Sequence, residues 1–327
     1  MRENNVVAVT VTYNRVNTLE KTIDALTNQN MLLDKIIVVD NNSSEEHKKI
    51  LKDIEKSNDL VEVVWLNENL GGAGGFYHGM KVAKEKYNPN WYWIMDDDAY
   101  PTKDCLKNLL EYKDKLDNIG FLAPAIYGID NKKYQMYHHK MISKYKTNDI
   151  TAVAEYEDLE NVTNIEANAF VGPLFSRKAV EELGLPKGEL FIYGDDTEYT
   201  YRVTRKYRGY VIKDAIINHQ DPPYQGKAVA PEGWWKEYYM FRNRYLFIDE
   251  FGVNGFEKII AKVSLTMHLL RRILASSIKS QYKYFRKIRI KVLTSAINDG
   301  INGNEGRIIN PKEYIDSIKN IRKKNKL

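Results

Sequence analysis

The stretch from Trp91 to Asp98, Trp-Tyr-Trp-Ile-Met-Asp-Asp-Asp, runs from five large, mostly apolar side chains directly into three carboxylates. Aromatic and β-branched side chains fit a pleated surface, so residues 91–95 predict a buried strand. The three anions that follow repel one another and are costly to desolvate without a counter-charge. Carboxylate oxygens suit hard divalent cations such as Mg²⁺ and Mn²⁺, so the triplet is a candidate cation site. A solvated acidic turn is the alternative, because charge runs are usually solvated.

Strands and helices alternate on both sides of this stretch. Hydrophobic patterns predict strands at residues 6–13, 35–39, 61–66, 91–95 and 210–217. Helices are expected at about 19–28, capped by Thr18, and at 45–56, 76–87, 102–117, 177–183 and 195–207. This alternation predicts an α/β fold with a mostly parallel, doubly wound sheet flanked by helices. Residues 121–165 carry only weak signals, and residues 231–293 predict a mainly helical region.

The composition is that of a globular protein. The chain has 327 residues, of which 43% are hydrophobic and 28% are charged. Cys105 is its one cysteine, so no intrachain disulfide can form, which fits a reducing compartment. The first residues lack the apolar core of a signal peptide, and no apolar run reaches the roughly 18–20 residues that cross a bilayer. We therefore expect a cytoplasmic protein without a membrane span.

Positive charge is concentrated in the last quarter of the chain. The formal net charge is +5, yet residues 258–298 contain no acidic residue. The basic residues of this stretch are Lys258, Lys262, Arg271, Arg272, Lys279, Lys283, Arg286, Lys287, Arg289 and Lys291. The asymmetry predicts an anionic partner, either a lipid surface or a nucleic acid. The alternative is a basic helical region that packs internally or mediates dimerisation.

Polar side chains follow several predicted strands at the point where each strand ends. Thr12, Asn14 and Arg15 follow the first strand, and Asp40 follows the second. The carboxylate triplet and His219 follow two later strands. Because the carboxyl ends of parallel strands share one edge of a doubly wound sheet, we expect these groups to converge.

A glycine-rich segment, residues 71–75, precedes one predicted helix. It is not a dinucleotide-binding fingerprint, because Tyr77 stands where that pattern requires its third glycine. Glycine does permit close approach of a ligand to the backbone at a helix N-terminus. Gly71 and Gly72 are therefore candidate ligand-binding residues, and a flexible connection is the alternative.

A second acidic group, Asp195, Asp196 and Glu198, opens a predicted helix. The helix dipole stabilises anions there, but one Asp is enough to cap the helix. The other carboxylate is therefore a candidate for accepting a proton from a substrate hydroxyl group. Trp234, Trp235, Tyr238, Arg242 and Asn243 could share one face of a later predicted helix. This face either packs in the core or forms an aromatic and cationic wall for an acceptor.

In this order, the motifs resemble those of the inverting nucleotide-sugar glycosyltransferases of family 2, which have the GT-A fold. Residues 9–15 resemble the opening strand and nucleotide loop of that family. Asp40 resembles the Asp that contacts the nucleobase. Asp96 and Asp98 resemble the outer members of its Asp-x-Asp motif, which binds a metal ion and the donor diphosphate.

Within this family the segment from Asn69 to Phe76 looks most like galactofuranosyltransferases, and the resemblance covers roughly residues 6–250. It implies that Asp196 is the catalytic base, that Asp195 helps to bind acceptor hydroxyl groups and that His219 completes the metal shell. Gly194 stands where those enzymes have Trp. The resemblance assigns nucleotide-sugar binding to Thr12, Asn14, Arg15, Asp40, Asn69, Gly71, Gly72 and Asp97, and acceptor binding to Glu198, Trp234, Trp235 and Arg242.

The activity that the resemblance implies is a metal-dependent, inverting transfer of galactofuranose from UDP-galactofuranose to a hydroxyl group of a growing, lipid-linked cell-surface glycan. Mn²⁺ or Mg²⁺ is the expected cofactor. Transfer from deoxythymidine-diphosphate rhamnose is the alternative within the family. A basic nucleic-acid-binding protein and a non-catalytic sugar-nucleotide binder are alternatives outside it. The first leaves both acidic groups unexplained and shows no recognised motif, so we expect no nucleic-acid partner.

We expect two regions. Residues 1–230 would form the GT-A nucleotide-sugar-binding and catalytic domain, and residues 231–327 a helical region with the acceptor wall. Between residues 258 and 298, apolar side chains interleave with Lys and Arg, which is typical of interfacial helices on an anionic leaflet. We therefore expect a peripheral location on the inner face of the cell membrane, where a lipid-linked acceptor is presented. The same region is compatible with a homo-oligomer.

Overall fold

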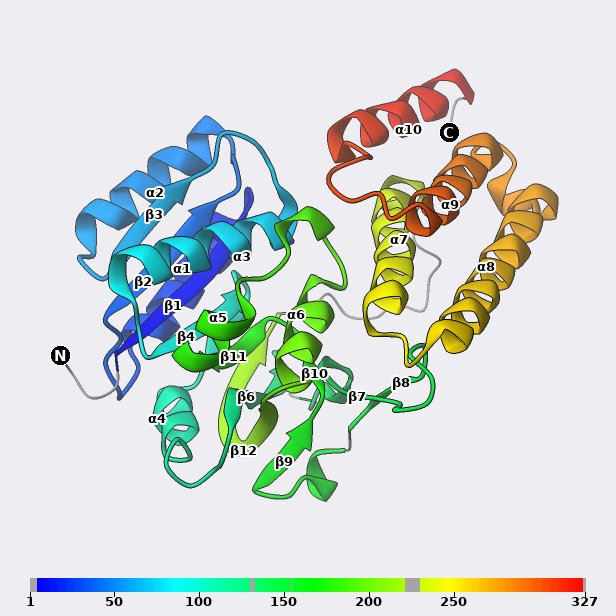
Figure 1. Cartoon of the computed structure of the whole chain (residues 1–327). Helices are drawn as coiled ribbons and strands as arrows, with labels where there is room; N and C mark the ends of the chain where they lie inside the picture. The colour runs from blue at the N-terminus through cyan, green and yellow to red at the C-terminus, as the bar shows by residue number, and fades with distance from the viewer. Residues whose placement is uncertain (1–4, 130–132, 154, 221–229, 326–327) are drawn as a thin grey trace. The chain divides into compact units, whose positions relative to one another are not determined.

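The predicted strand that ends in the carboxylate triplet is β4, Trp91–Asp96, and it lies inside a large mixed sheet (Figure 1). The computed structural model describes residues 5–129, 133–153, 155–220 and 230–325. The chain divides into two units. The sheet unit contains Met1–Met141, Thr151–Gly188 and Asp195–Pro223, and the helical unit contains Ile142–Ile150, Glu189–Gly194 and Tyr224–Leu327.

The exact boundary expected near residue 230 stays a prediction, because residues 221–229 lie outside the described ranges. The sequence did not indicate that two short segments, Ile142–Ile150 and Glu189–Gly194, would group with the helical unit although they precede its helices in the chain. The chain therefore crosses between the units more than once.

The sheet is mixed and mostly parallel, as expected. Among the described residues its strand order is β3-β2-β1-β4-β11-β6-β12-β5, with β9 paired to β12. β1 pairs in parallel with β2 and β4, and β12 pairs in parallel with β6. The other strands are β1 Val6–Thr12, β2 Lys35–Asp40, β3 Val61–Trp65, β5 Ala99–Pro101, β6 Ile119–Gly128, β9 Val162–Ile165, β11 Val171–Ser176 and β12 Arg208–His219.

Antiparallel strands, which the sequence did not predict, decide where the late strands end. β11 pairs antiparallel with both β4 and β6. Since β12 runs parallel to β6, β12 also runs in the same direction as β4. The carboxyl ends of β4 and β12 therefore share one edge of the sheet, and this edge carries both the triplet and His219.

Helices cover both faces of the sheet (Figure 1). Side chains alternate along β1, where Val6 and Ala8 enter one buried cluster and Val7 and Val9 enter the other. The first cluster includes side chains of α1, α2 and α4, and the second includes side chains of α3, α5 and α6. The helices are α1 Val16–Thr27, α2 Glu45–Ser57, α3 Gly71–Val82, α4 Cys105–Leu110, α5 Arg177–Leu183 and α6 Asp195–Thr204. A separate short strand, β7 His139–Ile142, pairs with β10 Ala167–Asn168.

Two helix predictions need correction. The helix expected over residues 102–117 is shorter in the structure, where α4 covers only Cys105–Leu110 and Asn118, with φ of 53°, precedes β6. α1 begins at Val16 and not after Thr18. The Thr18 hydroxyl donates to the carbonyl of Arg15 over 2.8 Å, so it lies within the first turn and does not cap the helix.

The glycine-rich segment is the start of α3 and not a flexible connection. A Cβ atom added to Gly75 would lie 2.4 Å from Cγ1 of Val11. At Gly79 the corresponding distance to Cγ1 of Val9 is also 2.4 Å. The glycines therefore let α3 lie directly against β1, which no side chain at these positions would permit.

The helical unit is built from α7 Trp234–Phe251, α8 Gly255–Ile278, α9 Arg286–Ile301 and α10 Pro311–Asn325. Its core contains Leu269, Leu293 and aromatic side chains of α7. The carboxylate of Glu237 joins the helices, because its Oε2 lies 2.5 Å from Arg272 and 2.7 Å from Arg289. None of the helices among the described residues has the length and apolar character required to cross a membrane.

Candidate functional site

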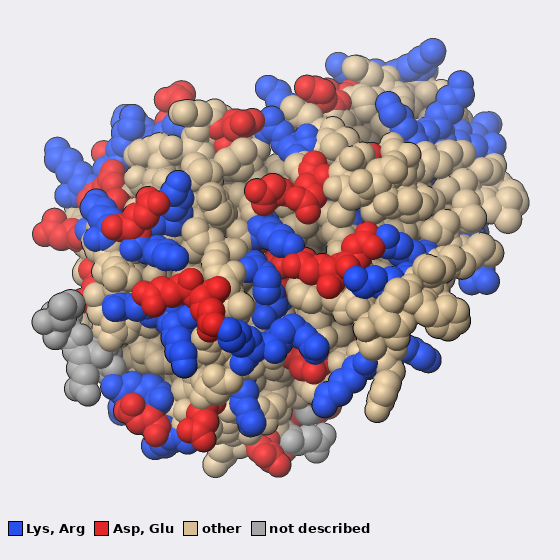
Figure 2. All heavy atoms as spheres, viewed as in Figure 1, with Lys and Arg blue, Asp and Glu red and all other residues tan. Residues whose placement is uncertain are grey.

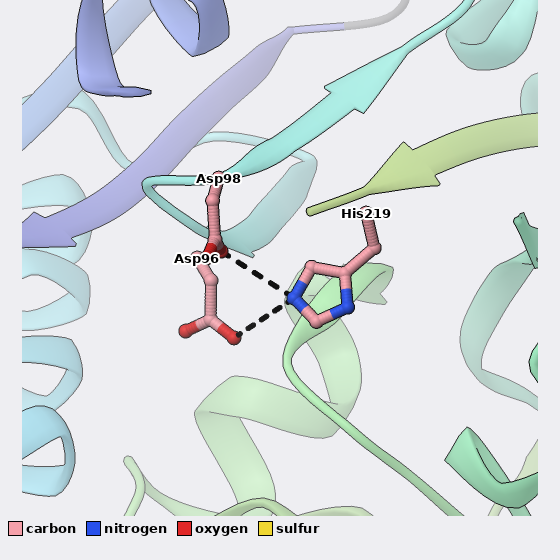
Figure 3. A group of neighbouring side chains, drawn as sticks. All are labelled: Asp96, Asp98 and His219. Atoms are coloured by element: carbon pink, nitrogen blue, oxygen red, sulfur yellow. Dashed lines mark ion pairs between the residues drawn. The ribbon is translucent and has the colours of Figure 1, made fainter. Parts of the chain in front are cut away.

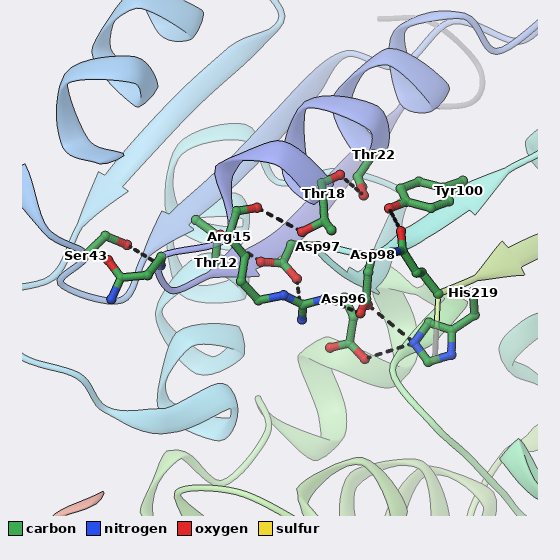
Figure 4. Close-up of polar contacts among 12 residues, drawn as sticks. Thr12, Arg15, Thr18, Thr22, Ser43, Asp96, Asp97, Asp98, Tyr100 and His219 are labelled. Carbon is green, nitrogen blue, oxygen red and sulfur yellow. Dashed lines mark hydrogen bonds and ion pairs between the residues drawn. The ribbon is translucent and has the colours of Figure 1, made fainter. Parts of the chain in front are cut away.

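The ends of β1, β2, β4 and β12 bring the predicted polar groups together at one edge of the sheet (Figure 4). Thr12, the last residue of β1, lies opposite Asp40, the last residue of β2. β4 ends beside them at Asp96, and β12 ends at His219. His219 lies opposite Ala99, directly after the triplet. The predicted convergence is confirmed, and the short strand β5 is what fixes His219 in it.

Asp96, Asp98 and His219 form a compact group of candidate metal ligands (Figure 3). Nε2 of His219 lies 3.4 Å from Oδ1 of Asp98 and 4.0 Å from Oδ2 of Asp96. One ligand atom from each residue lies within 4.8 Å of the others. Asp98 and His219 are buried, whereas 46% of the Asp96 side chain is exposed. The group is therefore open to solvent on the side of Asp96.

Neighbouring side chains orient the imidazole of His219. Its Nδ1 lies 3.4 Å from Oε1 of Gln135, which can accept a hydrogen bond from it, and Nε2 faces the carboxylates. The backbone N–H of Gln220 donates to the carbonyl of Asp98 over 2.9 Å. The Tyr100 hydroxyl in turn donates to Oε1 of Gln220 over 2.9 Å. These bonds tie the end of β12 to the triplet.

Arg15 pairs with the other side of the triplet (Figure 4). Its Nη1 lies 2.9 Å from Oδ1 of Asp97, and its Nη2 forms an ion pair with Oδ2 of Asp98. The Thr12 hydroxyl donates to the second oxygen of Asp97 over 2.7 Å. Both carboxylate oxygens of Asp97 therefore bind residues at the end of β1, one to Thr12 and one to Arg15, and the second contact positions Arg15. Contact between Asp97 and a donor sugar stays a prediction.

The same contacts set the charge state of the triplet. Burial raises the pKa of Asp97 to about 6, although Arg15 and Thr12 lower it in part. Burial also opposes ionisation of Asp98, but its bonds to His219 and Arg15 outweigh this and hold the pKa of Asp98 below its ordinary value. Three carboxylates thus share one arginine and one histidine among the described partners. The negative charge that remains favours a bound cation.

A second set of bonds joins the ends of β1 and β2. The backbone N–H of Ser43 donates to both carboxylate oxygens of the fully buried Asp40, over 3.1 and 3.2 Å. The backbone N–H of Asn14 donates to Oγ of Ser43 over 2.9 Å, and its side-chain oxygen accepts from Ser44 over 2.8 Å. Asn14 has φ of 56°, a left-handed conformation that asparagine tolerates. The two loops therefore form one wall, and contact with a nucleobase stays a prediction.

Asn41 ties the start of α3 to the same wall. Its Nδ2 donates to the carbonyl of Gly71, and its Oδ1 accepts from the backbone N–H of Leu70, both over 2.8 Å. Oδ1 of Asn69 accepts from the N–H of Gly71, also over 2.8 Å. A Cβ atom added to Gly72 would meet no atom within 4 Å. Gly72 therefore presents open backbone at a helix N-terminus, as close approach of a ligand requires.

Asp195 and Asp196 begin α6, and their environments differ. Asp195 is buried, and burial together with the neighbouring Asp196 raises the pKa of Asp195 to about 7. Asp196 keeps 26% of its side chain exposed, and its Oδ2 lies 3.9 Å from Nζ of Lys140 on β7.

Lys140 is a residue of this site that the sequence did not reveal. Its Nζ donates to Oγ1 of Thr197 over 2.7 Å, and Thr197 in turn donates its backbone N–H to Oδ1 of Asp196 over 2.6 Å. The lysine thus helps to orient Asp196. Lys140 and Gln135 both belong to the segment with weak sequence signals, and only long-range packing brings them to the site.

Glu198 occupies a different position from its two acidic neighbours. Its Oε1 lies 2.7 Å from Nε of Arg202, one turn later in α6, and 3.6 Å from Nζ of Lys187. Only 4% of its side chain is exposed. In this conformation Glu198 stabilises α6 through a buried ion pair, and the prediction that it binds an acceptor gains no support from its placement.

The predicted acceptor wall of the helical unit is largely core. Trp234 is buried against Phe285, with ring centroids 6.2 Å apart, and Arg242 is fully inaccessible. The Arg242 guanidinium donates to the carbonyls of Leu190 and Gly306 over 3.0 and 2.9 Å. The core-packing alternative therefore describes Trp234 and Arg242, because their polar groups and rings are already taken up. Trp235 is half-buried, so it alone of the three keeps accessible surface.

The loop Glu189–Gly194, which directly precedes Asp195 in the chain, is held by α7. Phe191 and Tyr193 have φ values of 67° and 62°, and Gly194 has φ of 87°. Such conformations persist for bulky residues only where the surroundings hold them. Nδ2 of Asn243 lies within 2.7–3.0 Å of three carbonyl oxygens of this loop. A tryptophan in place of Gly194 would be strained at this φ.

Asp96, Asp98 and His219 offer a set of atoms that fits a divalent cation. Two carboxylate oxygens and one imidazole nitrogen are ligands that Mn²⁺ and Mg²⁺ accept. Nε2 of His219 lies 3.4 and 4.0 Å from the two carboxylate oxygens, which does not exceed twice a metal–ligand bond of roughly 2.1 Å, and all three ligand atoms lie within 4.8 Å of one another. The exposed side of Asp96 leaves room for further ligands. The site therefore fits such an ion in both chemistry and spacing.

Curated relatives of this chain are galactofuranosyltransferases. GlfT1 of Mycobacterium tuberculosis is 28% identical over 271 residues, which are 79% of this chain and 85% of that protein. GlfT1 of Mycolicibacterium smegmatis is 27% identical over 204 residues, which are 61% of this chain and 65% of that protein. A family model described as glycosyl transferase family 2 matches residues 7–184, more than half of this chain.

Solved structures share the fold at low sequence identity. TarS 1–349 of S. aureus has a TM-score of 0.54 and 15% identity, and the match covers 92% of this chain and 83% of that one. The mannosyltransferase PcManGT from Pyrobaculum calidifontis, solved with GDP-Man and Mn²⁺, has a TM-score of 0.55 and 15% identity, with 91% and 87% covered. The expected GT-A fold is confirmed. Together with the family match, this shows that the chain belongs to glycosyl transferase family 2.

Proposed function

We propose that this glycosyltransferase transfers galactofuranose from UDP-galactofuranose to a hydroxyl group of a growing, lipid-linked cell-surface glycan, with inversion at the anomeric carbon. The observation that carries the proposal is the group formed by Asp96, Asp98 and His219, whose candidate ligand atoms all lie within 4.8 Å of one another. The Asp195–Asp196 pair at the start of α6 is a second acidic group in the same unit. The identity of 28% to the galactofuranosyltransferase GlfT1 supports the donor sugar.

The nucleotide-sugar donor would lie along the ends of β1, β2 and β4. Arg15 supplies a positive charge beside the triplet, with 47% of its side chain exposed. Gly72 supplies open backbone at the N-terminus of α3, where the helix dipole favours phosphate, and Gly71 precedes it with its N–H and carbonyl already hydrogen-bonded. Thr12, Asn14, Asp40 and Asn69 complete the wall that would receive the nucleotide.

Asp96, Asp98 and His219 would hold Mn²⁺ or Mg²⁺. Such an ion, when bound, supplies Lewis-acid neutralisation of the leaving diphosphate. The protein itself presents two carboxylate oxygens and Nε2 of His219 on the solvent-exposed side of the group, and Gln135 orients the imidazole ring. GalNAc-T7, which shares the fold with a TM-score of 0.54, was solved with UDP, GalNAc and Mn²⁺, as PcManGT was with GDP-Man and Mn²⁺.

Asp196 is the proposed general base, and Asp195 has a different role. Asp196 is the more accessible of the two, and contacts with Lys140 and Thr197 hold its carboxylate in a fixed orientation. With a pKa of about 7, Asp195 keeps a proton on a substantial fraction of molecules at neutral pH. A protonated Asp195 would donate a hydrogen bond to an acceptor oxygen while Asp196 takes the proton of the attacking hydroxyl group.

The acceptor part of the proposal sets the location. A lipid-linked acceptor would be presented at the inner face of the cell membrane, so we propose a peripheral enzyme there. Trp235 is the predicted acceptor residue with accessible surface, whereas Trp234, Arg242 and Glu198 would first have to leave their present contacts.

A donor panel tests the proposed function. Purified protein with Mn²⁺ and a membrane lipid extract as acceptor source should release nucleoside diphosphate at least 10-fold faster from UDP-galactofuranose than from UDP-galactopyranose, UDP-glucose or dTDP-rhamnose. Faster release from dTDP-rhamnose would contradict the proposed donor and would support the rhamnosyltransferase alternative. Equal background release from every donor would contradict a transferase with this donor set.

Substitution of the proposed base separates chemistry from donor binding. We expect Asp196→Asn to lower the transfer rate by roughly 10²- to 10⁴-fold, because a general base contributes about that much, and to leave donor affinity nearly unchanged. Asp96→Ala should lose donor affinity instead. The matched control is Asp53→Asn on the exposed face of α2. Calorimetric titration with UDP measures the affinity for the nucleotide, and single-turnover assays measure the transfer rate. A loss of affinity in Asp196→Asn as severe as in Asp96→Ala would rule out Asp196 as the base.

The raised pKa of Asp195 predicts a pH-dependent stability difference. A folded-state pKa of about 7, above the unfolded value of roughly 3.9, means that the folded state binds more protons between these values, so its stability falls as the pH rises through them. Asp195→Asn removes the carboxyl group and with it this loss of stability at higher pH. The free energy of unfolding of the variant relative to the wild type should therefore increase by roughly 1–4 kcal/mol between pH 5 and pH 8, and its relative melting temperature should rise accordingly. A difference that stays flat in thermal-shift scans, as expected for Asp53→Asn, would show that Asp195 ionises freely.

A further inference from the structure

An apolar stripe runs along one face of α8, and much of it is exposed. Most of its members lie three or four residues apart, so the helix brings them to one side. Between 47% and 74% of each residue is accessible. The residues of this α8 stripe are Phe256, Ile259, Ile260, Val263, Met267, Leu270, Leu274 and Ile278.

The opposite face of α8 already supplies what the fold requires. Ala261, Leu269 and Ser276 are buried, and Leu265 and Ile273 pack against the core of the helical unit. A surface helix of a globular protein normally has one apolar and one polar face. α8 has two apolar faces, and a contiguous exposed patch of this kind marks an interaction surface.

The surroundings of the α8 stripe are positively charged. The sequence has no acidic residue from Lys258 to Asn298. Two lysines on the inner side, Lys258 and Lys262, are engaged by Asp249. Figure 2 shows uncharged surface over α8 with Lys and Arg at its margins. Exposed basic residues are Arg271 on α8, Lys279 and Lys283 directly after α8, and Lys287 and Lys291 on α9.

We propose that the α8 stripe binds the surface of an anionic lipid bilayer, with α8 lying in the plane of the interface. The 24 residues of α8 give a helix about 36 Å long at roughly 1.5 Å per residue. Its apolar side chains would enter the boundary between headgroups and acyl chains, while the lysines that follow contact headgroup phosphates. This inference rests on the peripheral location in the proposed function and names the surface of the chain that would make the contact, while the donor and the catalytic residues play no part in it.

Charge selects the lipid surface over other occupants. A second copy of the chain on the same stripe would bring its own cations close to these, without acidic residues from this segment to offset them. A nucleic acid would neutralise the cations but leave the apolar side chains of the stripe in water. Anionic headgroups above an apolar layer complement both features at once.

Vesicle flotation of the full-length protein tests the apolar part of the proposal. We expect at least 10-fold more protein to float with vesicles of phosphatidylcholine and phosphatidylglycerol than with phosphatidylcholine alone. Val263→Glu with Leu274→Glu should abolish flotation. The matched control is Leu32→Glu with Ile308→Glu, which changes two exposed apolar residues outside α8 and should float like the wild type.

A charge variant tests the electrostatic part. Lys279→Ala, Lys283→Ala and Lys287→Ala together should remove most of the preference for phosphatidylglycerol. The same number of changes on α2, at Lys49, Lys52 and Lys56, should leave it intact, because these exposed lysines lie in the other unit. Far-ultraviolet circular dichroism and melting temperature establish that each variant is folded.

Three results would overturn the proposal. The first is a wild type that floats with neither vesicle, and the second is a folded stripe variant that floats like the wild type. The third is a concentration-dependent dimer in sedimentation velocity that the stripe variant dissociates, without vesicle binding, which would make α8 a contact between copies. Failure of the donor panel leaves all flotation results unaffected, so the two proposals are tested separately.

Discussion

Mutual repulsion of three carboxylates at the end of β4 is the constraint on which the rest of the site depends. Asp97 and Asp98 are buried, and an unpaired buried carboxylate is strongly disfavoured. Arg15 pairs with both of them, and His219 faces Asp98 and Asp96. The ends of β1 and β12 must therefore lie beside the end of β4. The same arrangement leaves negative charge on an open side, so a binding site for a cation follows from the way in which the fold balances its own charges.

The sheet supplies this balance through its topology. β11 reverses direction between β4 and β6, and β12 then returns parallel to both β4 and β6, so that His219 ends beside the triplet. β5 fixes the register by pairing Ala99 with His219. On the other side of β1, glycines of α3 permit close packing, and Asn41 ties the helix start to β2. Two loops and a helix N-terminus thereby form the wall that would receive a nucleotide.

The sequence predicted the parts of the site that local pattern determines. β-branched strands, the polar residues at their ends and the Asp195–Asp196 helix start were all visible, because periodicity and charge mark them. Gln135 and Lys140 were not visible, since they lie in short irregular elements and reach the site only by long-range packing. The same limit explains why the sequence left two alternatives open for Trp234 and Arg242, core packing and an acceptor wall. An amphipathic aromatic face looks the same in sequence whether it faces a ligand or a core, and the structure buries both residues.

The central claim is that Asp96, Asp98 and His219 form one cation site. Titration of Mn²⁺ into the metal-free protein, followed by electron paramagnetic resonance of the free ion, measures this without any assay of activity. The account predicts one site in the wild type, weakened at least 10-fold in both Asp96→Asn and His219→Gln. Asp53→Asn and His47→Gln on α2 should bind like the wild type. If Asp96→Asn and His219→Gln retain wild-type Mn²⁺ affinity, then Arg15 and solvent alone balance the triplet and the account is contradicted.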